Sequence, residues 1–537
     1  MPALTSSLNT RSPAFAANVA RMNERLGEVR RLEQMVRDES NSKRDKFEKR
    51  GQIVPRERVA RLIDRGSDFL EFSTLAGLAM HDDDGKKSVL GGGSIAGIGI
   101  VAGKRCVISA SDSAIKGGTI PPMGLKKALR MQEIAALNKL PLIYLAESGG
   151  ANLMYQAEIF VDGGRSFANQ ARLSAAGIPQ IAVVHGSSTA GGAYLPGLSD
   201  YTILVRGRSS IYLAGPPLVK AAMGEDVDDE TLGGAETHAT VTGLGEYLCE
   251  NDEHAIAMAR EVMDKLRWTA VSPAPTCGKP PRYDVEELMG VVPASDTEPY
   301  DARELIARLV DDSDFLEFKA AYATDTLCGH ARIDGHLVGI LANNGPIQPT
   351  GSVKAAQFIQ LCDQSQTPLV FLQNTTGYMV GSQAERAGAI KHGSKMIQAV
   401  ANARVPKLTI VVGGSFGAGN YGMCGRGFDP RFIFTWPSAR TAVMGAAQAA
   451  KVMEIVSRAK LEKAGAPVNE DGLKAMSEGL RLRLEKESTV LYGTARLWDD
   501  GIIDPRDTRR VLSLCLAICA EADARQLQPN AFGVARM

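Results

Sequence analysis

The sequence has little that would suit a nucleic-acid-binding or membrane-spanning protein. Lys and Arg together number 61, and Asp and Glu also number 61, so the formal net charge is zero. Without a global basic field, neither nucleic acid nor an anionic membrane is expected as the main partner. No hydrophobic run is long enough to span a bilayer, and no apolar signal core opens the chain. We expect a cytoplasmic protein, although Ser, Arg and Ala with no acid before Glu24 also suit an organelle transit sequence.

Cysteine is sparse and unpatterned. The eight cysteines are scattered over 537 residues without a C-x-x-C pair, which excludes a disulfide scaffold. The seven histidines show no metal-ligand spacing, so no metal is predicted. The acidic run Asp82–Asp84 is interpreted as a solvated loop rather than a metal site.

Glycine is abundant, with 55 residues, and much of it belongs to an internal repeat. The stretches "ARLIDRGSDFLEF" (60–72) and "ARLVDDSDFLEF" (307–318) are alike apart from one inserted residue. Farther along, a shift of 227 residues lays Gly192 on Gly419 together with most of their neighbours. The chain therefore consists of two homologous halves.

Each half alternates short buried-strand patterns with helix patterns. This alternation predicts parallel sheets with crossover helices, which is an α/β fold. The segment 272–301 is rich in Pro, Ser and Asp and is interpreted as the linker. We predict a helical extension (1–50), an N-terminal domain (51–280) and a C-terminal domain (281–537).

Each half also carries two small-residue turns about forty residues apart. They read "SGGA" (148–151) and "TAGGA" (189–193), then "NTTG" (374–377) and "FGAGN" (416–420). The second turn of each pair is expected to begin a helix, where unpaired N–H groups and the helix dipole favour a negatively charged oxygen. A single Gly-Gly turn more often reflects close packing. Its repetition in register favours a pair of oxyanion holes.

The spacing from "SGGA" to "TAGGAYLPGLSD" resembles the crotonase fold, whose members hold acyl-CoA thioester oxygens in such holes. Two tandem crotonase-like (ClpP/crotonase) ββα-repeat halves resemble the carboxyltransferase subunit of biotin-dependent acyl-CoA carboxylases. The resemblance runs from about Arg50 to the C-terminus. The texts "FLQNTTGYMVG", "IYLAGPPLVKAAMGE" and "GGSFGAGNYGMCGRGFDP" resemble the methylcrotonyl-CoA and geranyl-CoA branch. The resemblance implies an enzyme of a biotin-dependent ligase complex.

The same resemblance implies the chemistry of the two holes. One would hold the enolate of the acyl-CoA thioester, and the other the ureido oxygen of carboxybiotin. Loss of CO2 from carboxybiotin leaves a biotin anion that takes the substrate proton, so no side-chain base is needed. The backbone groups of Gly191 and Gly192 are assigned to the thioester. Those of Ala418 and Gly419, from another subunit, are assigned to biotin, and the reverse assignment stays open.

Further binding residues are carried over from the matching turns. For acyl-CoA they are Ser148, Gly149, Gly150, Ala151, Gly163, Gly164, Lys116, Gly117 and Gly118. For biotin they are Thr376, Gly377, Tyr378, Phe416, Gly417, Asn420 and Tyr421. Lys116, Lys126 and Lys127 are candidates for the CoA phosphates, although lysines on a helix are usually solvated.

The chain departs from the methylcrotonyl-type pattern after "SGGA". Residues 152–177 are shorter, and Gly163-Gly164 stands where that pattern has a bulky aromatic residue. A tolerated surface-loop deletion or an enlarged acyl pocket explains this change, and its place beside the predicted acyl site favours the pocket. The substrate indicated is geranyl-CoA, from acyclic terpene catabolism. The alternative is 3-methylcrotonyl-CoA, from leucine degradation.

The sequence contains neither a P-loop lysine motif nor a biotin-attachment lysine between methionines. The resemblance therefore implies a biotin carboxylase/biotin carrier α subunit as partner, with this chain as the β6 core of an α6β6 assembly. Two other classes are weighed. A biotin-free hydratase or isomerase would place Glu or Asp beside the thioester, and neither glycine turn supplies one at the helix start. A non-catalytic scaffold would not need small-residue turns.

Overall fold

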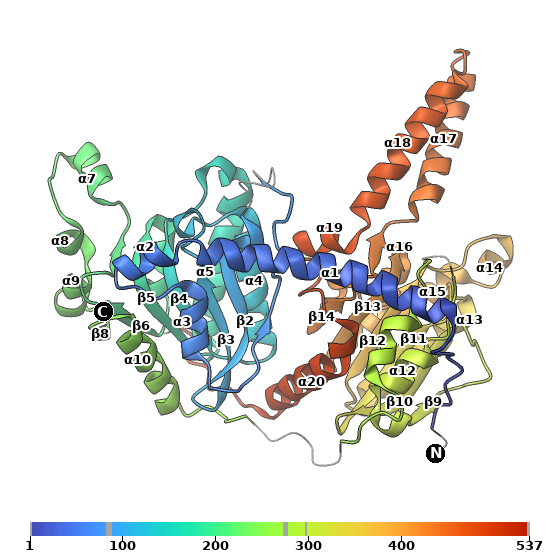
Figure 1. Cartoon of the computed structure of the whole chain (residues 1–537), viewed down its shortest axis with the longest axis horizontal. Coiled ribbons are helices and arrows are strands. Elements are labelled where there is room, and N and C mark those ends of the chain that lie inside the picture. The colour runs from blue at the N-terminus through green and yellow to red at the C-terminus, as the bar shows by residue number, and fades with distance from the viewer. Residues whose placement is uncertain (1–2, 82–88, 272–277, 296–297, 534–537) are drawn as a thin grey trace. The chain divides into compact units, whose positions relative to one another are not determined.

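The computed structural model describes residues 3–81, 89–271, 278–295 and 298–533 (Figure 1). The acidic run Asp82–Asp84 and part of the expected linker lie outside these residues. The chain divides into two compact units. The N-half unit contains Arg30–Ser272, Ala495–Leu497 and Ile518–Met537, and the C-half unit contains Met1–Val29, Pro273–Thr494 and Trp498–Ala517. Within the described ranges, no helix is long and apolar enough to cross a membrane.

The N-half unit is built around an eight-stranded sheet with the order β1-β2-β3-β4-β5-β6-β8, and β7 pairs with β5. The first three strands are antiparallel, and the later pairs are parallel. The strands are β1 (Leu70–Glu71), β2 (Ser94–Val101), β3 (Lys104–Ser111), β4 (Leu142–Ser148), β5 (Gln180–Thr189), β6 (Tyr201–Val205), β7 (Ser210–Tyr212) and β8 (Tyr247–Cys249). Ile143 and Val183, on the two central strands, are fully buried. Such continuous apolar runs are typical of parallel strands, which helices cover on both faces.

Helices supply the other side of this core. Leu62 of α3 and Ile256 of α10 pack in the same buried cluster as the strand residues. The helices are α2 (Arg44–Lys49), α3 (Pro55–Leu62), α4 (Pro122–Leu137), α5 (Gln156–Ala175), α6 (Tyr194–Gly197), α7 (Pro216–Met223), α8 (Asp229–Gly233), α9 (Ala235–Thr240) and α10 (Asp252–Lys265). Pro122 at the first position of α4 fits the helix start, where no N–H partner is needed.

The C-half unit repeats the plan with a seven-stranded sheet, in the order β14-β13-β12-β11-β10-β9 with β15 paired to β13. The strands are β9 (Phe315–Glu317), β10 (Thr326–Ile333), β11 (His336–Asn343), β12 (Leu369–Thr375), β13 (Lys407–Phe416), β14 (Phe432–Thr435) and β15 (Arg440–Ala442). The helices are α11 (Leu288–Val291), α12 (Arg303–Leu309), α13 (Pro349–Gln364), α14 (Ser382–Arg386), α15 (Ala389–Asn402), α16 (Gly417–Gly422), α17 (Ala446–Lys463), α18 (Glu470–Glu487) and α19 (Val490–Ala495). Helices α1 (Pro13–Asn41) and α20 (Thr508–Ala524), and α19 through Ala495, contribute residues to both units. The predicted α/β architecture with two repeated halves is confirmed.

The repeat extends to individual ion pairs and buried lysines. Arg56 of α3 pairs with Glu71, and Arg303 of α12 pairs with Glu317, each through two guanidinium–carboxylate hydrogen bonds. Lys127 of α4 is buried and donates to the carbonyls of residues 91 and 94, while Lys354 of α13 donates to those of residues 322 and 323. Equivalent positions of the two halves thus hold the same residue types in the same kinds of contact.

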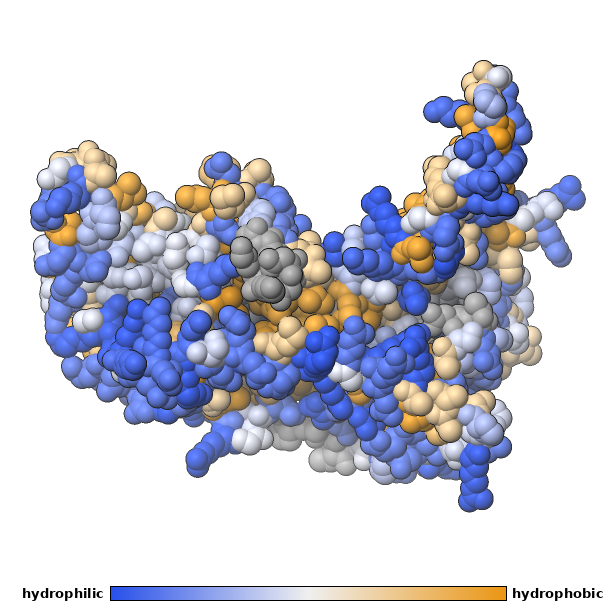
Figure 2. Space-filling view, turned by 45° about the horizontal axis from the view of Figure 1, so that its top comes forward, coloured by the Kyte–Doolittle hydropathy of each residue, from blue (hydrophilic) through white to orange (hydrophobic). Residues whose placement is uncertain are grey.

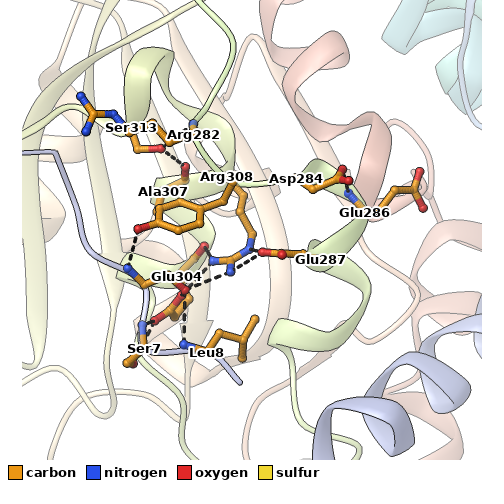
Figure 3. Close-up of polar contacts among 12 residues, drawn as sticks. Ser7, Leu8, Arg282, Asp284, Glu286, Glu287, Glu304, Ala307, Arg308 and Ser313 are labelled. Atoms are coloured by element: carbon orange, nitrogen blue, oxygen red, sulfur yellow. Dashed lines mark hydrogen bonds and ion pairs between the residues drawn. The ribbon is translucent and has the colours of Figure 1, made fainter. Parts of the chain in front are cut away.

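A buried arginine organises the start of the C-half unit (Figure 3). The Arg308 side chain is 1% exposed and pairs with Glu287 at 2.6 Å and Glu304 at 2.8 Å. Glu304 also accepts hydrogen bonds from Ser6 Oγ and from the Ser7 backbone N–H. Because the carboxylate has several donors, the N-terminal segment is fixed on this unit.

Candidate active site

The predicted turns of the N-half unit lie against one another at the carboxyl edge of the parallel strands. Ser148 ends β4, and its Oγ accepts a hydrogen bond from Gly150 N at 3.1 Å. A β-carbon built on Gly192 would lie 3.3 Å from Ser148 Oγ, and one on Gly150 would lie 3.4 Å from the Thr189 carbonyl oxygen. The absence of side chains therefore lets the two backbone turns meet.

A third turn completes this edge. Gly118 has φ +74°, and a β-carbon there would lie 2.2 Å from the Glu147 carbonyl oxygen, so only glycine fits. A β-carbon on Gly149 would lie 3.3 Å from the carbonyl oxygen of Gly117. A bridge between Ile120 and Ala151 ties the same segments together. The structure thus brings residues 116–118, 148–151 and 189–192 together.

The lysines near this edge differ sharply in exposure. Lys116 and Lys126 are exposed, so both can reach anionic groups in solvent. Lys127 is buried, and its Nζ donates to Gly91 O at 3.0 Å and Ser94 O at 2.7 Å. Burial lowers the pKa of Lys127 to about 8. The expectation that Lys127 contacts CoA phosphates is wrong, and so is the alternative that it is solvated, because its ammonium group is bonded inside the protein.

The C-half unit repeats the pair of turns. Thr375 Oγ1 accepts a hydrogen bond from Gly377 N at 3.2 Å, as Ser148 does from Gly150. A β-carbon on Gly419 would lie 2.8 Å from Gly377 Cα. Helix α16 begins at Gly417, which has φ +53° and lies close to the Val443 carbonyl oxygen. The first backbone N–H groups of α16 therefore stand beside the end of β12.

The side chains around this second turn point in different directions. Thr376 and Ala418 are exposed, Phe416 is half-buried, and Tyr421 is half-exposed and stacks on Phe428 at 5.6 Å. Asn420 is turned inward, because its Nδ2 donates to Ser415 Oγ at 2.7 Å.

The Tyr378 ring is also turned inward. It packs against Gly393 and Gly422, and its hydroxyl donates to the Gly393 carbonyl at 3.4 Å. Burial raises the pKa of Tyr378. Asn420 and Tyr378 can therefore contact biotin through their backbone groups, but not through the amide and hydroxyl groups that are bonded inside the protein.

A cavity of about 810 Å³ lies in the C-half unit. It is lined by the loop that follows Tyr378 and by the first turn of α13. The lining residues are Tyr322, Gln348, Pro349, Thr350, Val353, Met379, Val380, Gly381, Ser382, Gln383, Ala384, Ala387 and His392. The expected biotin residues Thr376–Tyr378 and 416–421 are not part of this lining.

The segment with Gly163 and Gly164 is a helix, not a loop. Both glycines lie in the middle of the 20-residue helix α5, and a β-carbon on either would meet nothing within 4 Å. The loop-deletion alternative is wrong in this respect. Buried Ile159 and Leu173, on another face of α5, explain how packing keeps a helix despite two adjacent glycines.

The two glycines lie between two aromatic rings on one face of α5. Phe160, Gly163, Gly164 and Phe167 follow the i, i+3, i+4, i+7 spacing that shares a helix face. Phe160 is 82% exposed, and the Phe167 ring lies 3.7 Å from the β-carbon position of Gly191. The face therefore forms an open apolar strip that begins at the Gly191 turn. The helical spacing of these four residues is visible in the sequence, but Phe160 and Phe167 were not among the expected site residues.

Comparison with known proteins places these features in a family. The carboxyl transferase domain family matches residues 46–534. The chain belongs to the carboxyl transferase family. It is therefore an enzyme, as the sequence analysis predicted, and the predicted relation to carboxyltransferase subunits of acyl-CoA carboxylases is confirmed.

Three relatives illustrate how close the match is. A probable biotin-dependent acyl-coenzyme A carboxylase β2 subunit of Mycobacterium tuberculosis is 47% identical, over 99% of this chain and 100% of the relative. A probable methylcrotonoyl-CoA carboxylase β chain of Drosophila melanogaster is 45% identical, over 99% and 95%. The crystal structure of the P. aeruginosa geranyl-CoA carboxylase β subunit is 58% identical with a TM-score of 0.94, covering 100% of both chains. The two crotonase-like halves are thereby confirmed as the fold.

Proposed function

We propose that this chain is the carboxyltransferase subunit of a geranyl-CoA carboxylase, which carboxylates the γ-carbon of a β-methyl-branched enoyl-CoA. The observation that carries the proposal is the apolar strip of α5, where Gly163 and Gly164 leave space between Phe160 and Phe167 next to the Gly191 turn. A geranyl chain is longer than a methylcrotonyl group and needs such a strip. The 58% identity to a geranyl-CoA carboxylase β subunit supports the same substrate.

The N-half turns supply the thioester site in this proposal. The backbone N–H groups of Gly191 and Gly192 donate to the thioester oxygen as negative charge develops on it during γ-deprotonation. Exposed Lys116, in the turn that touches Gly149, meets the phosphates of CoA. The acyl chain then runs from Gly191 along Phe167 and the glycine pair. Binding through the CoA portion orients the thioester before the chemical step.

The C-half turn supplies the biotin site, and its chemistry fits that group. Carboxybiotin, when bound, supplies CO2 and then a base for the γ-proton of the substrate. Exposed Ala418 and the Gly419 N–H at the start of α16 would hold the ureido oxygen, and 80%-exposed Val443 would offer an apolar contact beside Gly417. Among the described residues, no group of three or more His, Cys, Asp or Glu side chains could hold a metal. The biotin belongs to a partner, the biotin carboxylase/biotin carrier α subunit.

A homo-oligomeric core is part of the proposal. The hairpin of α17 and α18 projects from the C-half unit, and hydrophobic residues lie along its surface (Figures 1 and 2). Val452, Ile455, Val456 and Leu482 are each about half-exposed. Such a row needs a cover, and another copy of this chain in a β6 core of an α6β6 assembly provides one. We also propose the cytoplasm as the compartment. The domain limits at residues 50 and 280 remain predictions from the sequence.

The test is biotin-dependent carboxylation by the reconstituted complex. This chain is combined with its biotin-bearing partner, and fixation of labelled bicarbonate into geranyl-CoA is followed with and without avidin, which sequesters biotin. We expect fixation that avidin abolishes. Fixation only into 3-methylcrotonyl-CoA would favour the alternative substrate, which the 45% identity to a methylcrotonoyl-CoA carboxylase β chain supports. No fixation with any acyl-CoA would favour a scaffold.

A further inference from the structure

A buried ion pair lies directly beneath the acyl-CoA turns of the N-half unit. The Arg58 side chain, on α3, is 1% exposed, and its Nη1 donates to Glu147 Oε2 at 2.7 Å. Glu147 is the residue immediately before Ser148, at a point where the register of β4 against β5 shifts. Irregular strand positions of this kind re-aim side chains and are frequent next to active sites.

Glu147 touches all three turns or the residues that lead into them. Its carbonyl oxygen lies against Gly118, as described above, and its carboxylate lies 2.8 Å from the β-carbon position of Gly186 on β5. Ser148, which follows it, bonds Gly150. A shift of the Glu147 backbone therefore moves the 116–118 and 148–151 turns together.

Arg58 is itself held by a second buried acid. Its Nε lies 3.4 Å from Asp252 Oδ2, which also accepts from Ile53 N at 2.8 Å. Asp252 Oδ1 accepts from His185 Nδ1 at 2.9 Å, and His185 directly precedes Gly186. Burial lowers the pKa of His185, so the neutral imidazole donates this hydrogen bond. The chain of contacts ties α3, α10, the end of β4 and the middle of β5 to one guanidinium group.

The C-half unit shows that the fold does not require these charges. Asn374 occupies the position of Glu147, also at a register shift, and its Oδ1 accepts directly from Gly414 N at 3.0 Å. When Ala60 is aligned with Ala307, the counterpart of Arg58 is buried Leu305. Because buried ion pairs add little net stability, the pair in the N-half unit calls for a local reason.

We propose that Arg58 and Glu147 are positioning residues that set the Ser148–Gly150 turn for the acyl-CoA thioester. The inference rests on the proposed function of the N-half turns and deepens it. Neither side chain touches the reacting atoms. Both act through the backbone of Glu147 and Ser148.

The test compares R58K and E147Q with R56K in the complete biotin-bearing complex. R56K is the control, because Arg56 is two residues away on α3 and forms an ion pair with Glu71 on β1, although the Arg56 side chain is 22% exposed and that of Arg58 is 1% exposed. We expect R58K and E147Q to lower kcat by about 10- to 100-fold, with the KM for bicarbonate, which is consumed at the partner subunit, unchanged. A kcat within about twofold of the wild type, or an equal loss in R56K, would overturn the proposal.

Amide hydrogen exchange separates this inference from the proposed function. Faster exchange in residues 142–152 is expected in R58K and E147Q but not in R56K, and it is measured without any substrate. If the wild-type complex fixed no bicarbonate, the proposed function would fail while this measurement still judged the positioning role. Unchanged exchange in all three variants would overturn it.

Discussion

The backbone of Gly419 lies so close to Gly377 that a β-carbon on Gly419 would stand 2.8 Å from Gly377 Cα. G419A must therefore push the two turns of the C-half unit apart. Since removal of one oxyanion donor costs about 10²- to 10³-fold in rate, we expect kcat to fall by about that much. Steady-state carboxylation measures it. G427A is the control, because a β-carbon at Gly427 meets nothing within 4 Å, and equal activity of the two variants would remove the C-half hole from the mechanism.

Refilling the strip on α5 should change substrate preference. G164F places a ring between Phe160 and Phe167, where a β-carbon has open space, so folding is expected to be retained. We expect kcat/KM for geranyl-CoA to fall by about 10- to 100-fold, while that for 3-methylcrotonyl-CoA stays near wild type. The control G164A should keep geranyl-CoA activity and raise stability by about 0.5–1 kcal/mol, since glycine is unfavourable inside a helix. Undiminished geranyl-CoA activity in G164F would rule out the strip as the acyl site.

The three lysines should separate into one structural and two solvent-facing residues. K127M removes the donor that bonds Gly91 O and Ser94 O, so we expect a loss of about 1–3 kcal/mol in the free energy of unfolding. K116M should instead raise the KM for acyl-CoA several-fold. Denaturant unfolding and steady-state kinetics measure the two effects, with exposed K265M on α10 as the control. A raised KM in K127M with unchanged stability would show that its ammonium group does reach CoA.

Asp499 should make stability depend on pH in the acid range. Burial raises its pKa from 3.8 to about 6, although Thr494 and Thr435 donate to its carboxylate. The pKa of Asp499 is higher in the folded protein than in the unfolded chain, so its protonated carboxyl stabilises the fold fully below about pH 3.8. The free energy of unfolding then decreases as pH rises through about 6, because the buried group must ionise. D499N should remove up to about 3 kcal/mol of this decline. The free energy of unfolding is measured between pH 3.5 and 7.5, with exposed D264N as the control. The same pH dependence in D499N and wild type would contradict the raised pKa of Asp499.

Much of the fold could be predicted from the sequence because its signals are local or repeated. The apolar runs that end in "SGGA" and "NTTG" mark β4 and β12, and the glycine turns after β5 and β13 lie where their 227-residue repeat placed them. Two adjacent glycines, in contrast, have a low helix propensity, and the loop-deletion alternative for residues 152–177 agreed with that preference. Tertiary packing of the neighbouring face of α5 overrode that local preference.

The orientation of side chains and the long-range partners could not be read in the same way. Lys126 and Lys127 are neighbours in sequence, yet the helix turns one to solvent and the other onto two carbonyl groups. Tyr378 follows a predicted turn but packs inward against Gly393. Arg58 and Glu147 are 89 positions apart, and no periodicity in the sequence pairs them.

The most direct test of the account is the ratio of kcat/KM for geranyl-CoA to that for 3-methylcrotonyl-CoA in the wild-type complex. The strip between Phe160 and Phe167 predicts a ratio above one, by roughly tenfold or more, because burial of the longer chain contributes about 0.8 kcal/mol for each CH₂ group. A ratio well below one, with robust biotin-dependent turnover of 3-methylcrotonyl-CoA, would contradict geranyl-CoA as the substrate. The carboxyltransferase activity would then be retained, with 3-methylcrotonyl-CoA as its substrate.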